Sequence, residues 1–372
     1  MAFEVRSVES RRDIRTFIRL PYQLYRGDRV WVPPLLMEQK KKFSPTANPS
    51  LFHCDYRYFL LFRDGRAVGR ICAFIHRQAV EHWKESVGTF GCYECINDTE
   101  GSERLLDAVR QWLKRQGMGC MRGPWDFDTK EWGFVVKGFD RRPMLMAPYN
   151  PPYYNDQMEA FGMKKVKDLM AYEMDARDGY DLSERFLRLT GRIRERYGVT
   201  IRSVDMEKLD RDIKIVVDVA NESTKDNWGY VPVTDAEAHA IARSMKPIVD
   251  PEIVIIAEVE SRPVAYLIAF PDLNTVIKDL NGRLFPLGFL KLLWGRRKIR
   301  QYRIWALGII PEYQRKAIDT LFYERLYEVF SHKKFDRIEA NYVLEDNMAM
   351  SNPILKLGFR ESKRYRVYEM SL

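Results

Sequence analysis

Residues 303–326 read RIWALGIIPEYQRKAIDTLFYERL, and this stretch decides the fold class. A run of apolar, strand-favouring residues ends at Pro311, and apolar residues then recur at helical spacing at Ile318, Phe322 and Leu326. The stretch therefore predicts a strand, a short turn and a helix. Gly308, inside the strand, predicts a bulge or a close backbone approach that opens space beside the end of the strand.

The start of the predicted helix has the features of an anion site. Its first backbone N–H groups have no partner within the helix, and its dipole is positive at this end, next to Arg315 and Lys316. That combination suits a pyrophosphate. Many strand-to-helix junctions of α/β proteins share these features and bind nothing, so the stretch alone leaves both interpretations open.

A second stretch, residues 337–359, reads RIEANYVLEDNMAMSNPILKLGF and predicts a strand, a loop and a short helix that ends at Gly358. The order strand, Gln-Arg-Lys-Ala turn, helix and strand, followed by Asn347 and then by Gly358 and Phe359, resembles the GNAT superfamily of acyl-CoA N-acyltransferases. The phosphate loop of that family is Gln or Arg, two residues, Gly, one residue, and Gly or Ala. Gln314, Ala317 and Asp319 stand at those places, so the glycines are missing.

An internal repeat predicts two similar halves. Residues 65–75 (GRAVGRICAFI) align with residues 261–271 (SRPVAYLIAFP), and residues 161–174 (FGMKKVKDLMAYEM) align with residues 357–370 (LGFRESKRYRVYEM), both at a shift of 196 residues. We therefore predict an α/β fold with mixed sheets, in two tandem GNAT-like domains. Their predicted bounds are 1–178 and 179–372, joined near residues 177–181.

The first half lacks the anion-binding features of the second. Asp98 or Thr99 is placed to cap a helix that runs to Arg115, and Glu100 and Glu103 lie in its first turns. These acids already complement the helix dipole, so a phosphate is disfavoured there. We predict that residues 1–178 form a degenerate, non-catalytic partner domain, and the resemblance to tandem GNAT proteins, in which one copy often degenerates, implies the same.

The resemblance implies a direct acyl transfer from CoA to an amine in the second half. Glu339 is the predicted general base, and it shares a strand face with Asn341; a solvated strand carboxylate is the alternative. Ile354 stands where the family often has the Tyr that protonates the thiolate, so Tyr342, Tyr230 or water is expected to replace it. The residues expected to bind CoA are Leu307, Gly308, Ile309, Gln314, Arg315, Lys316, Ala317, Ile318 and Asn347.

Two segments differ between the halves. Residues 123–152 are rich in aromatic residues and form either a satellite core or a substrate wall that includes Trp132 and Tyr154. Residues 275–301 (TVIKDLNGRLFPLGFLKLLWGRRKIRQ) combine apolar and basic residues, with no acid between Asp279 and Glu312. Residues 283–300 suit a membrane interface, and a helix packed on the domain or on a partner chain is the alternative.

Composition sets outer limits on these interpretations. The 372 residues are 46% hydrophobic, and 61 Lys and Arg against 52 Asp and Glu give a net charge of +9, which fits phosphate-rich ligands, nucleic acid or anionic membranes. We find no signal peptide and no spanning segment, and expect a cytoplasmic protein, free or peripheral on the inner membrane face. Cys92 and Cys95 have the spacing of metal ligands but no second pair, so we expect core thiols and no metal.

The predicted function is therefore an acyl-CoA-dependent N-acyltransferase that uses acetyl-CoA or a longer acyl-CoA. Residues 25–34 (YRGDRVWVPP), 123–128 (GPWDFD) and 149–154 (YNPPYY) resemble long bacterial GNAT proteins. Since relatives of that shape include ceramide synthases, which acylate a sphingoid base, the resemblance implies an amine acceptor that is either a lipid or small and polar. The alternative is a degenerate GNAT module that binds a ligand, a membrane or a partner without turnover. Transfer from a charged tRNA is a third possibility, although we do not expect nucleic acid as a partner.

Overall fold

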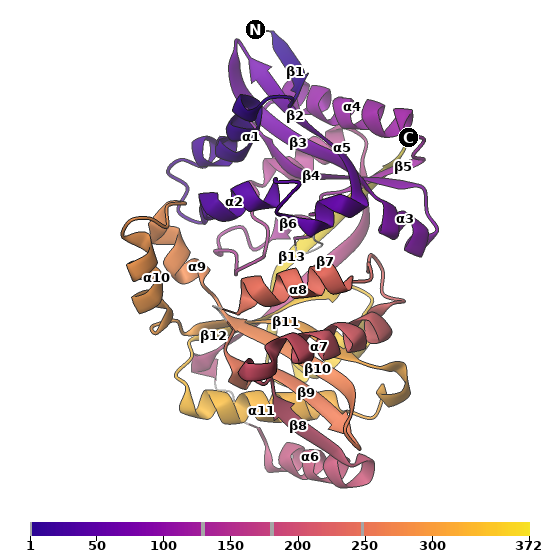
Figure 1. The fold of residues 1–372 in the computed structure, drawn as a ribbon, viewed down its shortest axis with the longest axis vertical. Helices are drawn as coiled ribbons and strands as arrows, with labels where there is room; N and C mark the ends of the chain where they lie inside the picture. The colour runs from indigo at the N-terminus through magenta and orange to yellow at the C-terminus, as the bar shows by residue number, and fades with distance from the viewer. Residues whose placement is uncertain (1, 128–130, 179–181, 247–248) are drawn as a thin grey trace. The chain divides into compact units, whose positions relative to one another are not determined.

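The structure is a computed structural model that describes residues 2–127, 131–178, 182–246 and 249–372 (Figure 1). Residues 179–181 of the predicted junction and residues 128–130 of the predicted aromatic segment lie outside the described residues. The chain forms two compact units. Unit 1 contains Met1–Met170, Val276–Leu293 and Lys363–Leu372, and unit 2 contains Ala171–Thr275 and Trp294–Ser362.

Unit 1 is built on a mixed sheet in the order β1-β2-β3-β4-β5-β13, with β6 also paired to β13. Neighbours are antiparallel except β4 and β5, which are parallel. The strands are β1 (Phe3–Ser7), β2 (Cys54–Arg63), β3 (Arg66–His76), β4 (Val87–Cys95), β5 (Cys120–Gly123), β6 (Phe134–Lys137) and β13 (Arg360–Ser371), whose last residues belong to this unit.

Helix α4 (Thr99–Arg115) provides the main core contact of unit 1. The Asp98 side chain caps it by accepting a hydrogen bond from the Gly101 N–H, as predicted. The predicted apolar face is buried against the sheet, with Leu105, Val109 and Leu113 fully buried. The other helices that lie wholly in this unit are α1 (Arg11–Leu24), α2 (Leu36–Lys42), α3 (Arg77–Trp83) and α5 (Tyr153–Ala160), and the first six residues of α10 (Gly288–Arg296) also belong to it.

Unit 2 repeats the arrangement. Its strand order is β7-β12-β11-β10-β9-β8, and β11 and β12 are its parallel pair among the registers described. The strands are β7 (Lys164–Asp175), whose last residues belong to this unit, β8 (Val199–Ser203), β9 (Val254–Val259), β10 (Arg262–Pro271), β11 (Gln301–Ile309) and β12 (Arg337–Leu344). Strands β3 and β10 begin 196 residues apart, as do β7 and β13, so the predicted repeat is confirmed.

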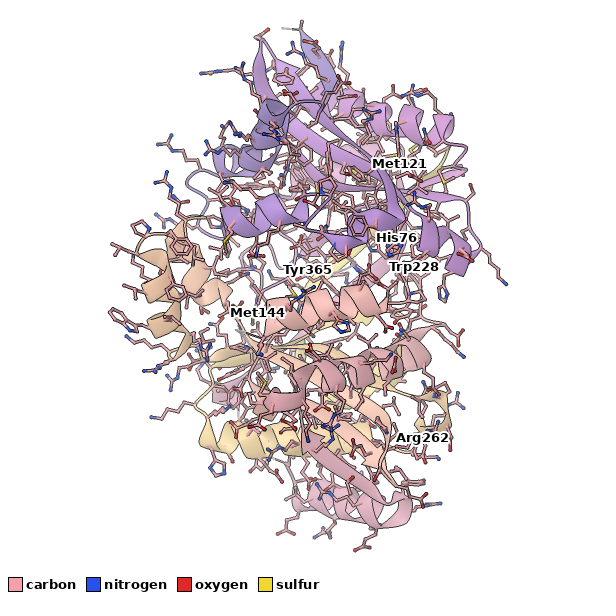
Figure 2. All side chains as sticks on the ribbon, viewed as in Figure 1. His76, Met121, Met144, Trp228, Arg262 and Tyr365 are labelled. Carbon is pink, nitrogen blue, oxygen red and sulfur yellow. The ribbon has the colours of Figure 1, made fainter. Side chains whose placement is uncertain are left out.

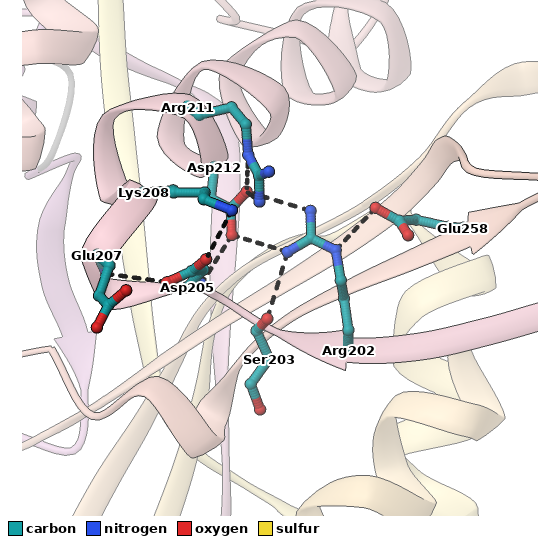
Figure 3. Close-up of polar contacts among 8 residues, drawn as sticks. All are labelled: Arg202, Ser203, Asp205, Glu207, Lys208, Arg211, Asp212 and Glu258. Carbon is teal, nitrogen blue, oxygen red and sulfur yellow. Dashed lines mark hydrogen bonds and ion pairs between the residues drawn. The ribbon is translucent and has the colours of Figure 1, made fainter.

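Helix α7 (Leu209–Thr224) packs against β10 and β11, and α11 (Asp319–His332) packs with α6 (Glu184–Tyr197) (Figure 1). Figure 3 shows how α7 is fixed: Arg202 of β8 donates to the buried Asp212 carboxylate over 2.7 Å and to Glu258 over 2.8 Å. Paired in this way, a buried carboxylate is tolerated in the core. The remaining helices wholly in this unit are α8 (Asp235–Met245) and α12 (Met348–Lys356), whereas α9 (Asn274–Ile277) and α10 cross the ends of the stretch Val276–Leu293 that belongs to unit 1.

We retain the boundary near residue 178 as a proposal for where the two sequence repeats meet. The compact units divide the chain differently, because each contains separated stretches. The C-terminal part of β13 pairs with β5 in unit 1, and β7 lies next to β12 in unit 2. The last strand of each repeat therefore completes the sheet begun by the other repeat.

Candidate functional site

Residues 310–318, between β11 and α11, form the loop at which the sequence places a phosphate site. Pro311–Tyr313 make one 3₁₀ turn, and the backbone then takes a left-handed conformation at Arg315 (φ 60°) and at Ala317 (φ 57°). Such φ values cost free energy for residues with a Cβ and favour Gly. Ala317 stands where the GNAT loop has its first Gly, so the left-handed turn is present here without that glycine.

Three contacts hold this loop within unit 2. The Gln314 side chain donates to the Ile309 carbonyl over 3.0 Å. Arg262, labelled in Figure 2 at the start of β10, donates to Glu312 over 2.8 Å. The Lys316 ammonium lies 4.2 Å from the centre of the Tyr313 ring. The loop therefore presents two cations, Arg315 and Lys316, on a backbone that its neighbours fix.

The first residue of α11 is acidic. Burial raises the pKa of the Asp319 carboxyl, although hydrogen bonds from its own N–H and from that of Thr320 act in the opposite direction. The Thr320 hydroxyl donates to the Ala317 carbonyl over 2.6 Å. A carboxylate at the positive end of a helix dipole competes with a bound anion. Asp319 therefore weakens the loop's attraction for a diphosphate whenever it is ionised.

Strands β11 and β12 part beside this loop. Their parallel register runs from Gln301 opposite Arg337 to Ile304 opposite Ala340, and among the described residues it goes no further. Residues 305–309 of β11 continue alongside β10. In the described register, the edge of residues 305–309 that faces away from β10 is therefore not paired with β12. Leu307, Gly308 and Ile309, which the sequence analysis predicts to contact the pantetheine arm, lie on this stretch.

The bulge predicted at Gly308 lies instead at Trp305. Ile268 of β10 is opposite Ala306 and Ala269 is opposite Ile304, which leaves Trp305 as the extra residue. Gly308 itself has a regular partner on β10, but the close approach is confirmed, because a Cβ there would overlap the Ser223 hydroxyl and the Tyr266 ring.

A polar cluster lies where the two strands separate. Glu339 is opposite Arg303 in the register, only 2% of Glu339 is exposed, and it accepts a hydrogen bond of 2.6 Å from the Asn341 side chain. Nε of the fully buried Arg303 donates to the Asn341 side-chain oxygen. The Arg303 guanidinium is 5.3 Å from the centre of the Tyr342 ring. The structure therefore brings Glu339 and Tyr342 to the same cluster, and Glu339 is buried rather than solvated.

Three other predicted residues have structural partners. Asn347 caps α12 by accepting a hydrogen bond of 3.2 Å from the Met350 N–H. Ile354 is buried, and the Tyr230 hydroxyl donates to Asn221. Helix capping explains the contact of Asn347, and side-chain packing explains the burial of Ile354. The predicted roles of Asn347 and Tyr230 in the reaction therefore remain predictions.

The inserted segment presents apolar side chains to the surface around α10. Phe285 is 69% exposed, Leu287 is 66% exposed and Trp294 is 68% exposed. Arg283, Lys291 and Arg296–Lys298 supply the positive charge along the same segment. Among the described residues no helix has the length and apolar character needed to cross a membrane.

The aromatic segment after β5 is packed into unit 1, where Phe134 joins the main core with Tyr154 while Trp125 and Tyr149 line a cavity, so the predicted alternatives of satellite core and substrate wall both stay open. Trp125 and Phe127 are buried, Trp132 packs on Trp125, and Tyr154 is buried with its hydroxyl on Glu94. Sequence reasoning missed Glu94, which lies beside a cavity in unit 1. The available signal was an acidic residue inside a strand expected to be buried. In the part of the chain that the structure describes, no group of three or more His, Cys, Asp or Glu residues could hold a metal ion.

Comparisons with known proteins agree with this fold. The chain is 33% identical over 375 residues to "Protein YghO" of Escherichia coli, covering 99% of this chain and 95% of the relative. It is 31% identical over 373 residues to the "Bacterial ceramide synthase" of Caulobacter vibrioides, covering 98% and 96%. No protein-family model matches the sequence.

Solved structures show the same architecture at low identity. A tandem GNAT protein from the clavulanic acid biosynthesis pathway superposes with a TM-score of 0.59 at 11% identity, over 100% of this chain and 98% of that one. A GCN5-related N-acetyltransferase from Sphaerobacter thermophilus gives a TM-score of 0.55 at 12% identity, over 99% and 95%. The chain therefore belongs to the family of Protein YghO of Escherichia coli and the bacterial ceramide synthase of Caulobacter vibrioides, and it has the fold of tandem GNAT proteins.

Proposed function

We propose that this protein is an acyl-CoA-dependent N-acyltransferase whose reaction takes place in unit 2. The observation that carries the proposal is the parting of β11 and β12 after Ile304 and Ala340, beside a loop with left-handed residues at Arg315 and Ala317. Successive backbone N–H groups in such a turn, at the start of a helix, form a concavity suited to a phosphate. The relative described as a ceramide synthase supports acyl transfer as the activity.

In this proposal each part of the site has a distinct task. Residues 314–318 bind the CoA diphosphate, and the open edge of residues 307–309 binds the pantetheine arm. The amine nitrogen attacks the thioester carbon, so that a C–N bond forms while the C–S bond breaks. A strand N–H stabilises the oxyanion of the tetrahedral intermediate, which lowers the barrier without a covalent enzyme intermediate.

Glu339 is the proposed base. Since the residue is 2% exposed and hydrogen-bonded to Asn341, it accepts the amine proton through a water molecule. Tyr342, in the same cluster, or water supplies the proton that the departing thiolate takes up. Arg303, opposite Glu339 in the register, donates to the side-chain oxygen of Asn341, and Asn341 in turn donates to Glu339, so Arg303 helps to orient the base.

The proposed acceptor is a lipid amine. Two observations support this choice: the 31% identical relative is described as a ceramide synthase, and the segment around α10 exposes Phe285, Leu287 and Trp294. Apolar side chains flanked by Lys and Arg bind at the surface of anionic bilayers. We therefore propose peripheral membrane binding through residues 283–300.

Ligand-induced thermal stabilisation tests the binding step. Acetyl-CoA, palmitoyl-CoA and free CoA should each raise Tm, since a ligand at 100 times its Kd adds about 2.7 kcal/mol to native-state stability. Arg315→Glu and Lys316→Glu should reduce the shift, whereas Arg104→Glu, at the helix start of unit 1, should not. Absence of any shift at saturating CoA would leave the non-catalytic module as the better description.

Flotation with liposomes tests the membrane step separately. Binding to vesicles that contain an anionic lipid should be lost when Phe285, Leu287 and Trp294 are all changed to Ser. A matched triple change of exposed apolar residues outside this segment (Phe52, Leu187 and Leu189 to Ser) controls for the general loss of apolar surface. Equal flotation of the first variant and the wild type would remove the membrane proposal.

A further inference from the structure

Helix α6 reaches the loop of residues 310–318 from outside the repeated part of unit 2. It ends directly before β8, which begins 196 residues after β1, so α6 precedes the first strand that the two repeats share. Both α6 and the loop belong to unit 2. The helix is therefore an addition to the repeated scaffold, and its last residue, Tyr197, contacts Lys316 of the loop.

Buried polar contacts hold α6 against α11, the helix that begins where the loop ends. The Thr190 hydroxyl donates to Oε1 of Glu324 over 2.7 Å, and the Arg194 guanidinium donates to Oε2 of the same carboxylate over 2.7 Å. Because Glu324 lies in the second turn of α11, these contacts fix the position of α6 relative to the loop. They account for the packing of the helix, but they do not involve its last two residues, Arg196 and Tyr197.

Two cations meet at the Tyr197 ring. The Lys316 ammonium lies 5.4 Å from the ring centre, and the Arg196 guanidinium also lies 5.4 Å from it, so the two charges are no more than twice that distance apart. The Lys316 ammonium is in addition 4.2 Å from the centre of the Tyr313 ring. Contacts between a cation and an aromatic face are favourable. The two rings therefore orient a pair of positive charges where the loop meets the helix.

No acid neutralises this pair of cations. Arg194, two residues earlier, forms an ion pair with Glu324. Among the described residues, by contrast, neither Arg196 nor Lys316 forms an ion pair with a carboxylate. Glu195 is the neighbour of Arg196 in sequence, but successive residues of a helix do not face each other. The two like charges repel each other, and a bound anion would relieve that repulsion.

The dipole of α6 acts against an anion at this place, because the C-terminal end of a helix carries about half an elementary negative charge. The two cations carry two full positive charges, so the balance still favours an anion, above all one with more than one negative charge. The Tyr197 hydroxyl has no hydrogen-bond partner in the part of the chain that the structure describes, and it can donate to an oxygen of such an anion.

We propose that Arg196, Lys316 and the Tyr197 hydroxyl bind the 3′-phosphate of CoA. One ribose separates this phosphate from the diphosphate, so a loop that binds the diphosphate at residues 314–318 brings the 3′-phosphate close to Lys316. A phosphate monoester carries a charge of about −1.5 to −2 at pH 7, which matches the two cations, and a guanidinium can bind it through two parallel hydrogen bonds. This inference rests on the proposed function, and it assigns to α6 the distinction between CoA and nucleotides that lack the 3′-phosphate.

Calorimetric titration of the whole protein with CoA and with dephospho-CoA tests the contact, because the two ligands differ only in the 3′-phosphate. At low ionic strength CoA should bind roughly tenfold more tightly, a modest effect for charged hydrogen bonds because Arg196 is exposed. The ratio should shrink as salt is added, since salt screens exposed charges. Equal affinity for the two ligands would overturn this inference and leave the proposed function standing. If neither ligand bound, both would be overturned.

Matched variants locate the contact. Arg196→Gln should weaken CoA binding about fivefold and leave the affinity for dephospho-CoA unchanged. Arg196→Lys keeps the charge and should retain most of the preference for CoA. Arg185→Gln removes the same charge from an exposed position about three turns earlier in α6 and should change neither affinity. An equal loss of affinity for both ligands in Arg196→Gln, or no loss for either, would contradict the assignment.

Discussion

The two repeats of this protein differ most at one corresponding place, the junction from strand to helix: β4 to α4 in unit 1 and β11 to α11 in unit 2. In unit 1, three residues (96–98) connect β4 to α4, Asp98 caps the helix, and Glu100 follows in its first turn. In unit 2, nine residues (310–318) connect β11 to α11, with left-handed backbone at Arg315 and Ala317. Both helices meet a carboxylate at their first turn, Asp98 in unit 1 and Asp319 in unit 2, so the junctions differ in the longer left-handed turn and in its two cations, Arg315 and Lys316.

The two units also differ in the charged groups that lie beside the gap between their parallel strands. Strands β4 and β5 part as β11 and β12 do, but the gap in unit 1 contains a cavity with Glu94, and the gap in unit 2 adjoins a basic loop. A duplicated scaffold thus offers a carboxylate in one copy and backbone N–H groups with cations in the other. The substitutions below test how far this division holds.

The largest expected effect is on turnover in unit 2. Glu339→Gln should lower kcat roughly a thousandfold, the range of general base catalysis, with CoA affinity close to that of the wild type. Glu100→Gln in unit 1 should leave both unchanged. Steady-state kinetics and calorimetry measure the two quantities. If Glu339→Gln lost kcat and CoA affinity equally, Glu339 would have a structural role in the cluster with Arg303 and Asn341.

The equivalent strands should differ in how they tolerate a methyl group. A Cβ at Gly91 of β4 would overlap the backbone carbonyl of Trp125, whereas a Cβ at Gly308 of β11 would meet only side chains. We expect Gly91→Ala to cost about 3 kcal/mol of unfolding free energy and Gly308→Ala about 1 kcal/mol, because side chains move more easily than backbone. Urea unfolding gives both values. A larger loss for Gly308→Ala would reverse the comparison.

Asp319 should be the residue that limits CoA affinity in unit 2. Asp319→Asn removes a negative charge beside the diphosphate and should tighten CoA binding about fivefold, equivalent to about 1 kcal/mol of helix-end electrostatics. Asp98→Asn, at the capped helix of unit 1, should not change CoA affinity. Calorimetry with free CoA distinguishes the outcomes, and weaker binding by Asp319→Asn would show that the carboxyl helps to form the site.

The same carboxyl predicts a pH effect on stability. Because burial raises the pKa of Asp319 above that of the unfolded chain, the native state binds the proton more tightly. Its contribution to stability is therefore present below the unfolded pKa and is lost as pH rises through the folded pKa. Unfolding free energies measured above about pH 4 should show this decline in the wild type and a smaller one in Asp319→Asn.

The smallest expected effect comes from backbone strain. Ala317→Gly should stabilise unit 2 by roughly 0.5 kcal/mol, because Gly adopts a φ of 57° without the penalty of a Cβ but gains entropy when unfolded. Ala108→Gly, inside helix α4 of unit 1, should destabilise by about 1 kcal/mol. Thermal unfolding compares them, and destabilisation by both would mean that the loop is not strained.

Local pattern explains which parts of the fold the sequence predicted. The strand, turn and helix around Pro311 depend on hydrophobic periodicity, and the repeat on two segments with one shift, so both were predictable. The left-handed turn at Arg315 and Ala317 was not, because neither residue type signals a positive φ. Of the two alternatives predicted at Gly308, the close approach is confirmed, while the bulge at Trp305 was not predicted because Trp gives no local signal for one.

The parts of the site that the sequence did not predict depend on tertiary contacts between residues that are far apart in the chain. Trp31, Glu94 and Tyr149 meet at one cavity from positions far apart in the chain, and no periodicity connects them. In unit 2 the spacing of Glu339 and Asn341 did predict a shared face, which their hydrogen bond confirms. The sequence alone did not show that Glu339 is buried, because it does not tell which residue of the neighbouring strand lies opposite. The register shows that this residue is Arg303.

The exchange of terminal strands constrains how the molecule is made. Residues 363–372 belong to unit 1, and their pairing with Cys120–Gly123 supplies an inner partner to its sheet. During synthesis, the sheet of unit 1 cannot be completed until residues 363–372 have left the ribosome. A frameshift or proteolytic cut near residue 362 would consequently damage the beginning of the protein, and expression of isolated halves would leave each without a strand.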